Sequence, residues 1–203
     1  VVVTFGCGSA ARFIGNIRVK ITNVYTGTWL AQFADGATKP LDCNGATISV
    51  SYTAISSTSG KVQLANDFTS SKAASSALYI YGEFDANDFN VTVPGLDTPD
   101  STGIIRMGNG TWTLNATYGW CTSADPAAVY CEGSTLKFTG GSATFRGAGA
   151  TYNILWFAPS TTGREFTFFD SNTISEIKND TTYPMTLTLA VTETQTITTW
   201  KLN

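Results

Sequence analysis

Alternating apolar and polar residues in many short segments are the feature that most constrains the fold of this 203-residue chain. Because side chains of a β-strand point to opposite faces in turn, this period of two is typical of strands with one buried face. The clearest examples are the segments 17–21, 48–52, 112–116 and 185–191. Further strands are expected at 77–81, 89–93, 104–107, 135–138, 152–157 and 165–169.

Turn-forming residues separate these segments, and the one helix candidate lies around residues 70–77. The clearest turn signals are Asp35-Gly36, Asn44-Gly45, Pro94-Gly95, Asn109-Gly110 and Gly140-Gly141. Many short strands divided by turns predict an all-β fold, either an immunoglobulin-like or pilin-like β-sandwich or a jelly roll. No sequence repeat and no linker between domains is visible. The stretch 185–202 lacks Gly and Pro, so we expect one very long strand or two strands joined by a bulge. The part 194–202 is expected to serve a different sheet or a neighbour.

Charged residues are scarce and histidine is absent, which narrows the possible functions. Charged side chains make up 13% of the chain, about half the usual quarter. The net charge of −3 provides no basic field for nucleic acid, and no apolar run reaches the roughly 18 residues of a membrane span. The absence of histidine excludes Ser-His-Asp and Cys-His catalysis. We therefore expect a protein that is not an enzyme and that needs no cofactor.

The four cysteines are Cys7, Cys43, Cys121 and Cys131. None forms a CxxC pair, so a zinc ribbon is a poor fit. An even number in an exported chain suggests two disulfides, for which four cysteines allow three pairings. We favour Cys121–Cys131, which would close a short loop, and Cys7–Cys43, which would tie the N-terminal strand to the body. Buried thiols are the alternative.

Four asparagines lie in Asn-x-Thr sequons, which are Asn90, Asn109, Asn115 and Asn179. Glycosylation there requires export of the chain and an accessible acceptor. Asn115 falls on the polar face of the segment 112–116, where its side chain would be accessible. Occupied sequons would place the chain outside the cell, with N-glycans as covalent partners.

Three other sets of residues could form sites. The acidic segment 83–88 could bind calcium, although it lacks EF-hand order and a solvated turn explains it better. The glutamates show no spacing typical of a glycosidase pair; they are Glu83, Glu132, Glu165, Glu176 and Glu193. Trp120 and Trp29 could stack on sugars, but most tryptophans of a sandwich lie in its core. No metal site is expected.

The first residues of the chain form an apolar segment that needs a sheet to pair with. They are Val1, Val2, Val3, Thr4 and Phe5, and Gly6 and Gly8 follow as a hinge. This strand could complete its own sheet, or it could add to the sheet of a neighbouring copy. Head-to-tail donation does not close and therefore produces a filament. We expect residues 1–8 to be a donor strand with its hinge, and residues 9–203 to be a single β-sandwich domain.

These features together resemble the thread filament subunits of Sulfolobus-type archaea. The resemblance rests on the apolar N-terminal strand, the abundant Thr and Ser, the scarce charge and the sequons. It implies a fold similar to bacterial type-1 pilins, polymerisation by donor-strand complementation through Val1–Phe5, and glycans on the sequon asparagines. The typical C-terminal pattern of bacterial chaperone–usher subunits is absent here, which disfavours usher-type assembly.

The sequence thus predicts a structural subunit of an extracellular, cell-surface filament that polymerises head to tail for adhesion or biofilm formation. Its partners would be neighbouring copies of itself. The alternatives are a lectin-like adhesin with a site at Trp120 or Trp29, a viral jelly-roll coat protein and, least favoured, a glycanase.

Overall fold

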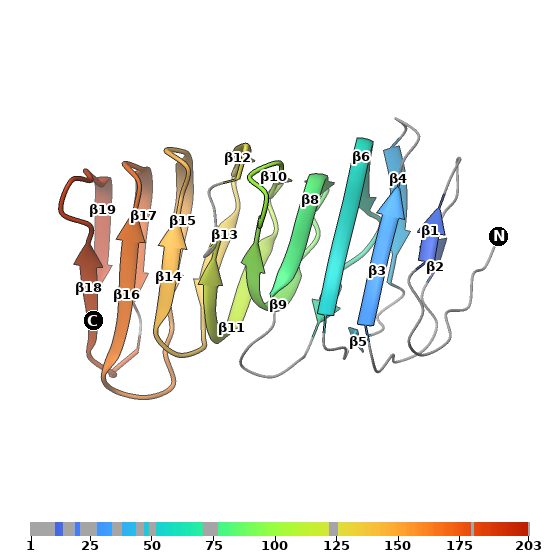
Figure 1. The fold of residues 1–203 in the computed structure, drawn as a ribbon. Coiled ribbons are helices and arrows are strands. Elements are labelled where there is room, and N and C mark those ends of the chain that lie inside the picture. Colours follow the sequence, from blue (N-terminus) through green and yellow to red (C-terminus); the bar gives the residue numbers. More distant parts are fainter. Residues whose placement is uncertain are drawn as a thin grey trace.

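The chain winds as a parallel β-solenoid (Figure 1). The structure is a computed structural model that describes residues 11–13, 19–20, 28–33, 38–43, 47–48, 52–70, 77–121, 126–179 and 181–202. Within these ranges the chain forms 19 strands and no helix. In Figure 1 the strands stand side by side in sequence order, from β1 and β2 at one end to β18 and β19 at the other.

The strand bounds, in chain order, are β1 (Ala11–Phe13), β2 (Val19–Lys20), β3 (Thr28–Phe33), β4 (Thr38–Asp42), β5 (Thr47–Ile48), β6 (Tyr52–Leu64), β7 (Phe68–Ser70), β8 (Leu78–Asp85), β9 (Val91–Asp97), β10 (Ile104–Arg106), β11 (Thr111–Trp120), β12 (Ala128–Tyr130), β13 (Thr135–Phe138), β14 (Ala143–Arg146), β15 (Thr151–Phe157), β16 (Arg164–Phe169), β17 (Thr173–Asn179), β18 (Met185–Leu189) and β19 (Thr196–Leu202). The predicted strands at 104–107, 135–138, 152–157 and 165–169 correspond to β10, β13, β15 and β16. Most of the helix candidate at 70–77 lies outside the described residues.

The all-β prediction is confirmed, but the predicted β-sandwich is wrong. Sandwiches and jelly rolls are built from antiparallel strands. Here every pairing between described strands is parallel and joins residues about one turn of the chain apart, as in β13 against β15. Alternation shows only that one face of a strand is buried, and it does not distinguish a sandwich from a solenoid.

One interior ladder shows how the turns stack. Its members follow one another through β7, β9, β11, β13, β15, β17 and β19, and they are Phe68, Val91, Trp112, Leu136, Leu155, Ile177 and Trp200. The step along the chain varies between 19 and 24 residues. Because both the step and the side chain change from turn to turn, the repeat is structural and leaves no periodic motif in the sequence.

Glycines bend the long strands β6 and β8 so that each belongs to two ladders. The pairing between these strands shifts register between Ser56 and Lys61 of β6. Gly60 and Gly82 lie at this shift with φ of +75° and +89°. Glycine is favoured there because it adopts positive φ without a steric penalty. The chain therefore changes direction without leaving the sheet.

Aromatic side chains fill the interior. Trp112, Trp120 and Tyr152 are buried and contact one another edge to face, with ring centroids 5.5 Å apart for the first pair and 6.5 Å for the second. Such pairs contribute about 0.5–1.5 kcal/mol beyond the burial of their area. The Trp120 Nε1 donates to the Tyr152 hydroxyl at 3.1 Å, so this buried polar group is satisfied. The contact between Trp120 and Tyr152 connects β11 with β15 inside one continuous core.

Candidate functional site

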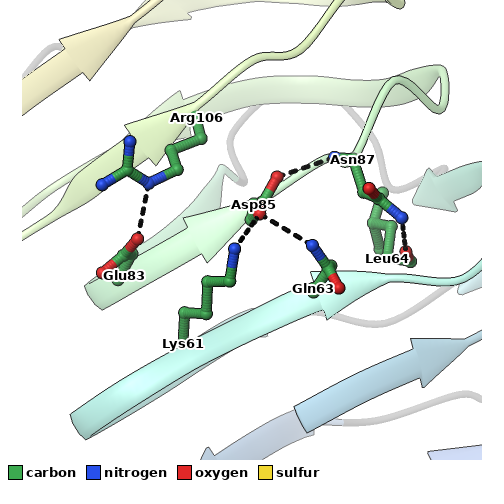
Figure 2. Close-up of polar contacts among 7 residues, drawn as sticks. All are labelled: Lys61, Gln63, Leu64, Glu83, Asp85, Asn87 and Arg106. Carbon is green, nitrogen blue, oxygen red and sulfur yellow. Dashed lines mark hydrogen bonds and ion pairs between the residues drawn. The ribbon is translucent and has the colours of Figure 1, made fainter. Parts of the chain in front are cut away.

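A polar lattice covers the outer face of β6, β8 and β10 (Figure 2). Lys61 and Gln63 come from β6, Glu83 and Asp85 from β8, and Arg106 from β10. These side chains meet because the two carboxylates are two residues apart on β8 and so share its outer face. Each carboxylate is then aligned with a polar residue of an adjacent turn.

Asp85 is the centre of the lattice. Its carboxylate accepts hydrogen bonds from the Lys61 ammonium, from Gln63 Nε2 at 2.9 Å and from the Asn87 backbone N–H at 2.9 Å (Figure 2). Burial opposes ionisation of Asp85, but the hydrogen bonds from Lys61, Asn87 and Gln63 and the charge of Lys61 lower its pKa below the ordinary carboxyl value. Three donors of the protein itself therefore hydrogen-bond to the Asp85 carboxylate.

Arg106 and Glu83 form the second half of the lattice. Arg106 Nε donates to Glu83 Oε1 at 2.6 Å, and the guanidinium lies 4.3 Å from the centroid of the Tyr130 ring. The hydrogen bond to Glu83 raises the pKa of Arg106 above its usual value, against the effect of burial. Since these contacts cross from one turn to the next, the lattice is suited to holding adjacent turns in register.

The acidic segment 83–88 is the end of a strand and a turn, not a calcium loop in this structure. Glu83 and Asp85 take part in the lattice, and Asp88 Oδ1 accepts from the Asn109 backbone N–H and Nδ2, both at 2.8 Å. Among the described residues, no group of three or more Asp, Glu, Cys or His side chains could hold a metal ion.

The other glutamates contact different partners on different turns. Glu176 pairs with Lys201 at 2.5 Å. Glu165 accepts from Thr188 at 2.7 Å, and Glu193 accepts from Ser171 at 2.9 Å. Glu132 lies in a turn with φ of +44°. The hydrogen bonds of the described residues link none of these four to one another.

The predicted disulfides are not found in the part of the chain that the structure describes. Cys43, Cys121 and Cys131 are buried thiols, and Cys7 lies outside the described residues. Burial raises the pKa of Cys43 to about 12, with a smaller effect from Asp42, and burial also raises the pKa of Cys131 to about 12. The prediction failed because cysteine is also a small apolar residue that fits a solenoid interior.

Three of the four sequon asparagines are exposed. Asn90 and Asn109 lie at turns, where their Nδ2 groups donate to Asp67 at 3.3 Å and to Asp88 at 2.8 Å. Asn115 is exposed on β11, as predicted from its polar phase. Asn179 is buried, and its Oδ1 accepts from the Thr181 backbone N–H at 3.0 Å. Asn115 is therefore the best acceptor for a glycan and Asn179 the poorest.

The aromatic site predicted for a lectin is not formed at Trp120. This side chain is fully buried and its Nε1 bonds Tyr152, so it presents no ring to a sugar. The side chain of Trp29 lies outside the described residues. Trp156 does lie on the outer face, where Lys137 and Lys178 contact its ring. The alternation of 152–157 would have identified it, because Trp156 has the phase opposite to the buried Leu155 and Phe157.

The last described turn of the solenoid exposes its interior side. It consists of β18 and β19, which pair with β16 and β17, and within the described residues neither strand has a partner on its other edge. Leu189, Trp200 and Leu202 are 51%, 49% and 55% exposed. A hollow of about 320 Å³ lies between the two strands, lined by Phe168, Ile177, Leu187, Leu189, Gln195, Ile197 and Trp200.

This open turn is a site that the sequence only partly indicated. The stretch 185–202 forms two strands on different ladders of the same sheet, separated by a turn. Two strands are therefore confirmed, but the expected bulge and the expected second sheet are wrong. The expected donor segment Val1–Phe5 lies outside the described residues. The described residues include no helix long and apolar enough to cross a membrane.

No protein family, curated protein or solved structure matches this chain.

Proposed function

We propose that this chain is a structural subunit that assembles head to tail with copies of itself, outside the cell, into a filament. The observation that carries the proposal is the open turn of β18 and β19, which combines a sheet edge that has no partner among the described residues with exposed apolar side chains. Such an edge is a template for pairing with another strand. Large exposed apolar patches on a protein are typical of interaction sites.

A second copy is the occupant that fits this face best. Within the solenoid, the surface of each turn is complementary to the next turn, which adds parallel strands with apolar side chains pointing inward. Among the described strands, the ladder that reaches β18 starts at β1, so a second copy placed head to tail would continue the same ladder from β18 to its own first strands. Because this contact repeats without closing, it produces a filament.

The segment Val1–Phe5 remains the candidate for the added strand. Its alternating apolar residues suit a parallel edge with pockets on one side, as in β-strand addition. Covering three half-exposed side chains, Leu189, Trp200 and Leu202, would contribute roughly 2–4 kcal/mol before ordering costs. The acceptor in this proposal is the end of a solenoid and not the groove of an incomplete sandwich.

The test is assembly of the purified chain. We expect the wild type to form oligomers whose mass rises with concentration by light scattering, and unbranched filaments in negative-stain images. Trp200→Glu and Leu189→Lys should both give monomers, because each places a charge in the apolar contact. Deleting residues 1–8 should have the same effect if Val1–Phe5 is the added strand.

Tyr130→Glu is the matched control, since Tyr130 is 45% exposed on β12 away from the open turn. It should assemble like the wild type. A wild-type chain that stays monomeric at all concentrations would contradict the proposal, and so would assembly that survives both charged substitutions. Assembly that is lost in those variants but survives the deletion would retain the open turn and exclude Val1–Phe5.

A further inference from the structure

On the ladder of β14, β16 and β18, the interior aromatic side chains stop before the last described turn (Figure 1). Phe145 and Phe168 are aligned on β14 and β16, and their ring centroids lie 5.2 Å apart. On β18 the residue aligned with Phe168 is Leu189, and the residue aligned with Phe166 is Leu187. The interior positions of this ladder therefore change from phenylalanine to the smaller leucine in the open turn.

The hollow between β18 and β19 lies where this ladder lacks a further ring. Phe168, the last interior ring of the ladder, forms part of its wall. The volume of about 320 Å³ is roughly twice that of an apolar cavity of ~150 Å³ that binds benzene, so the hollow has room for one phenyl ring. Side chains that face a space without partner atoms lose dispersion contacts. A ring placed in the hollow would restore these contacts.

The chemistry of the hollow favours an apolar occupant. Among the described residues that line it, none is charged and Gln195 is the one polar residue. Both polar atoms of the Gln195 amide are already bonded within the chain, because Oε1 accepts from Asn172 Nδ2 at 3.1 Å and Nε2 donates to the Asp170 carbonyl oxygen. A charged or strongly polar group buried here would lose its hydration without gaining a new partner. An apolar side chain has no such cost.

The segment that the proposed function adds to this turn contains one aromatic residue. Residues 1–12 lie outside the described ranges apart from 11 and 12, and their only aromatic residue is Phe5. In an extended strand, alternation places Val1, Val3 and Phe5 on one face. We propose that the phenyl ring of Phe5 from a second copy enters the hollow and extends the aromatic stack beyond Phe168. This inference rests on the proposed assembly and names the side chain that makes its central contact.

The first experiment removes the ring from the added segment. Phe5→Ala should raise the protein concentration needed for assembly, measured by light scattering, on the order of a hundredfold, because truncation of a buried phenylalanine leaves a void. Phe5→Leu should raise it on the order of fivefold, since leucine keeps most of the apolar volume but not the aromatic contact. Thr4→Ala is the matched control, because alternation turns this neighbouring side chain to the opposite face, and it should assemble like the wild type.

The second experiment fills the hollow with a ring of the chain's own. Leu187 lines the hollow and is aligned with Phe166, so Leu187→Phe should occupy the space and block assembly. Circular dichroism shows whether this variant remains folded. Leu202→Phe is the matched control, because Leu202 lies on the same turn but does not line the hollow. It should assemble like the wild type.

Methyl NMR of the filaments distinguishes an aromatic occupant from an aliphatic one. Protons that lie over the face of a ring are shielded, so the methyl signals of Leu187 and Leu189 should lie further upfield in wild-type filaments than in Phe5→Leu filaments grown at higher concentration. Both samples contain Trp200, so the difference reports on the added ring.

The inference and the proposed function fail in different ways. The inference is overturned if Phe5→Ala or folded Leu187→Phe assembles at wild-type concentrations, or if the leucine methyl signals are the same in wild-type and Phe5→Leu filaments. Normal assembly of Phe5→Ala together with monomeric Trp200→Glu and Leu189→Lys would keep the open turn as the interface and exclude the ring of Phe5. A wild-type chain that never assembles would overturn both proposals.

Discussion

At the scale of single residues, this protein uses its few charges to connect turns. Asp85 illustrates this, because its partners Lys61 and Gln63 come from the preceding turn and its own strand carries Glu83 to meet Arg106 of the next. Asp85 is only 8% exposed, whereas the side chains of Arg106 and Glu83 are 36% and 23% exposed. A buried carboxylate stabilises the fold only while its partners remain.

We predict that Asp85→Asn destabilises the protein by about 1–3 kcal/mol at pH 7, because hydrogen bonds to a charged group are replaced by weaker ones. The folded pKa of Asp85 is lowered, so its contribution is present above the unfolded pKa of about 3.9 and is lost as the pH falls through the folded value. Urea unfolding of both proteins from pH 7 to pH 3 should therefore show a difference that shrinks at acid pH. Asp100→Asn, in an exposed turn, should change stability by less than about 0.5 kcal/mol. An equal difference at pH 7 and pH 3 would show that the charge of Asp85 is irrelevant.

The buried thiols lead to a second prediction at this scale. In a Cys7→Ser variant, an aromatic disulfide reagent at pH 8 should leave the folded protein unlabelled and should react with all three remaining cysteines in denaturant. The reason is that the pKa values of Cys43 and Cys131 are raised from 9.0 to about 12, so almost no reactive thiolate is present. Since these folded pKa values are raised, stability should be unaffected below pH 9 and should fall between about pH 9 and pH 12. Rapid labelling of the folded protein would contradict the burial of these cysteines.

At the scale of elements, alternation identified strands but not their arrangement. The segment 135–138 was predicted correctly as β13, whose Leu136 and Phe138 are buried. Alternation does not show which strand pairs with which, because the same half-buried pattern arises in an antiparallel hairpin and in a parallel turn. The partners of β13 lie 24 residues before it and 19 residues after it. The irregular step hides the repeat in the sequence, so the solenoid is apparent only from the register of the strands.

The close approach of β14 to a glycine of β11 can be tested by substitution. Gly119 of β11 has φ of +91°, and a Cβ there would lie 2.2 Å from the Thr144 carbonyl oxygen of β14. Gly163 has a similar φ of +71°, but nothing lies within 4 Å of its Cβ position. Gly163→Ala should therefore cost about 1–2 kcal/mol, the backbone penalty alone. Gly119→Ala should cost about 3 kcal/mol or more, because β14 must also move away from β11. Thermal unfolding measures both, and equal costs would show that the approach of β11 to β14 is not tight.

At the scale of the whole molecule, a solenoid is stabilised by contacts between neighbouring turns. In such proteins each unit contacts only the units before and after it, so terminal units are less stable than central ones. β11 has partner strands on both sides, whereas β18 and β19 have described partners on one side only. The open turn is then both the weakest part of the isolated chain and the part that a second copy would stabilise.

Hydrogen exchange can measure this link between stability and assembly. In the monomeric Trp200→Glu variant, we expect the amides of β18 and β19 to exchange many times faster than those of β11, because the last turn can open without disrupting the rest. In wild-type filaments the same amides should become protected, because the carbonyl groups of an added strand would accept hydrogen bonds from the N–H groups at this edge. The amides of β11 serve as the internal control, because their protection should depend little on assembly. If β19 and β11 exchange at the same rate in the monomer, the solenoid unfolds as one unit and the open turn is not a separate element. If β19 stays unprotected in filaments, the copies join through a different surface, because an added strand cannot cover this edge and leave its amides exposed.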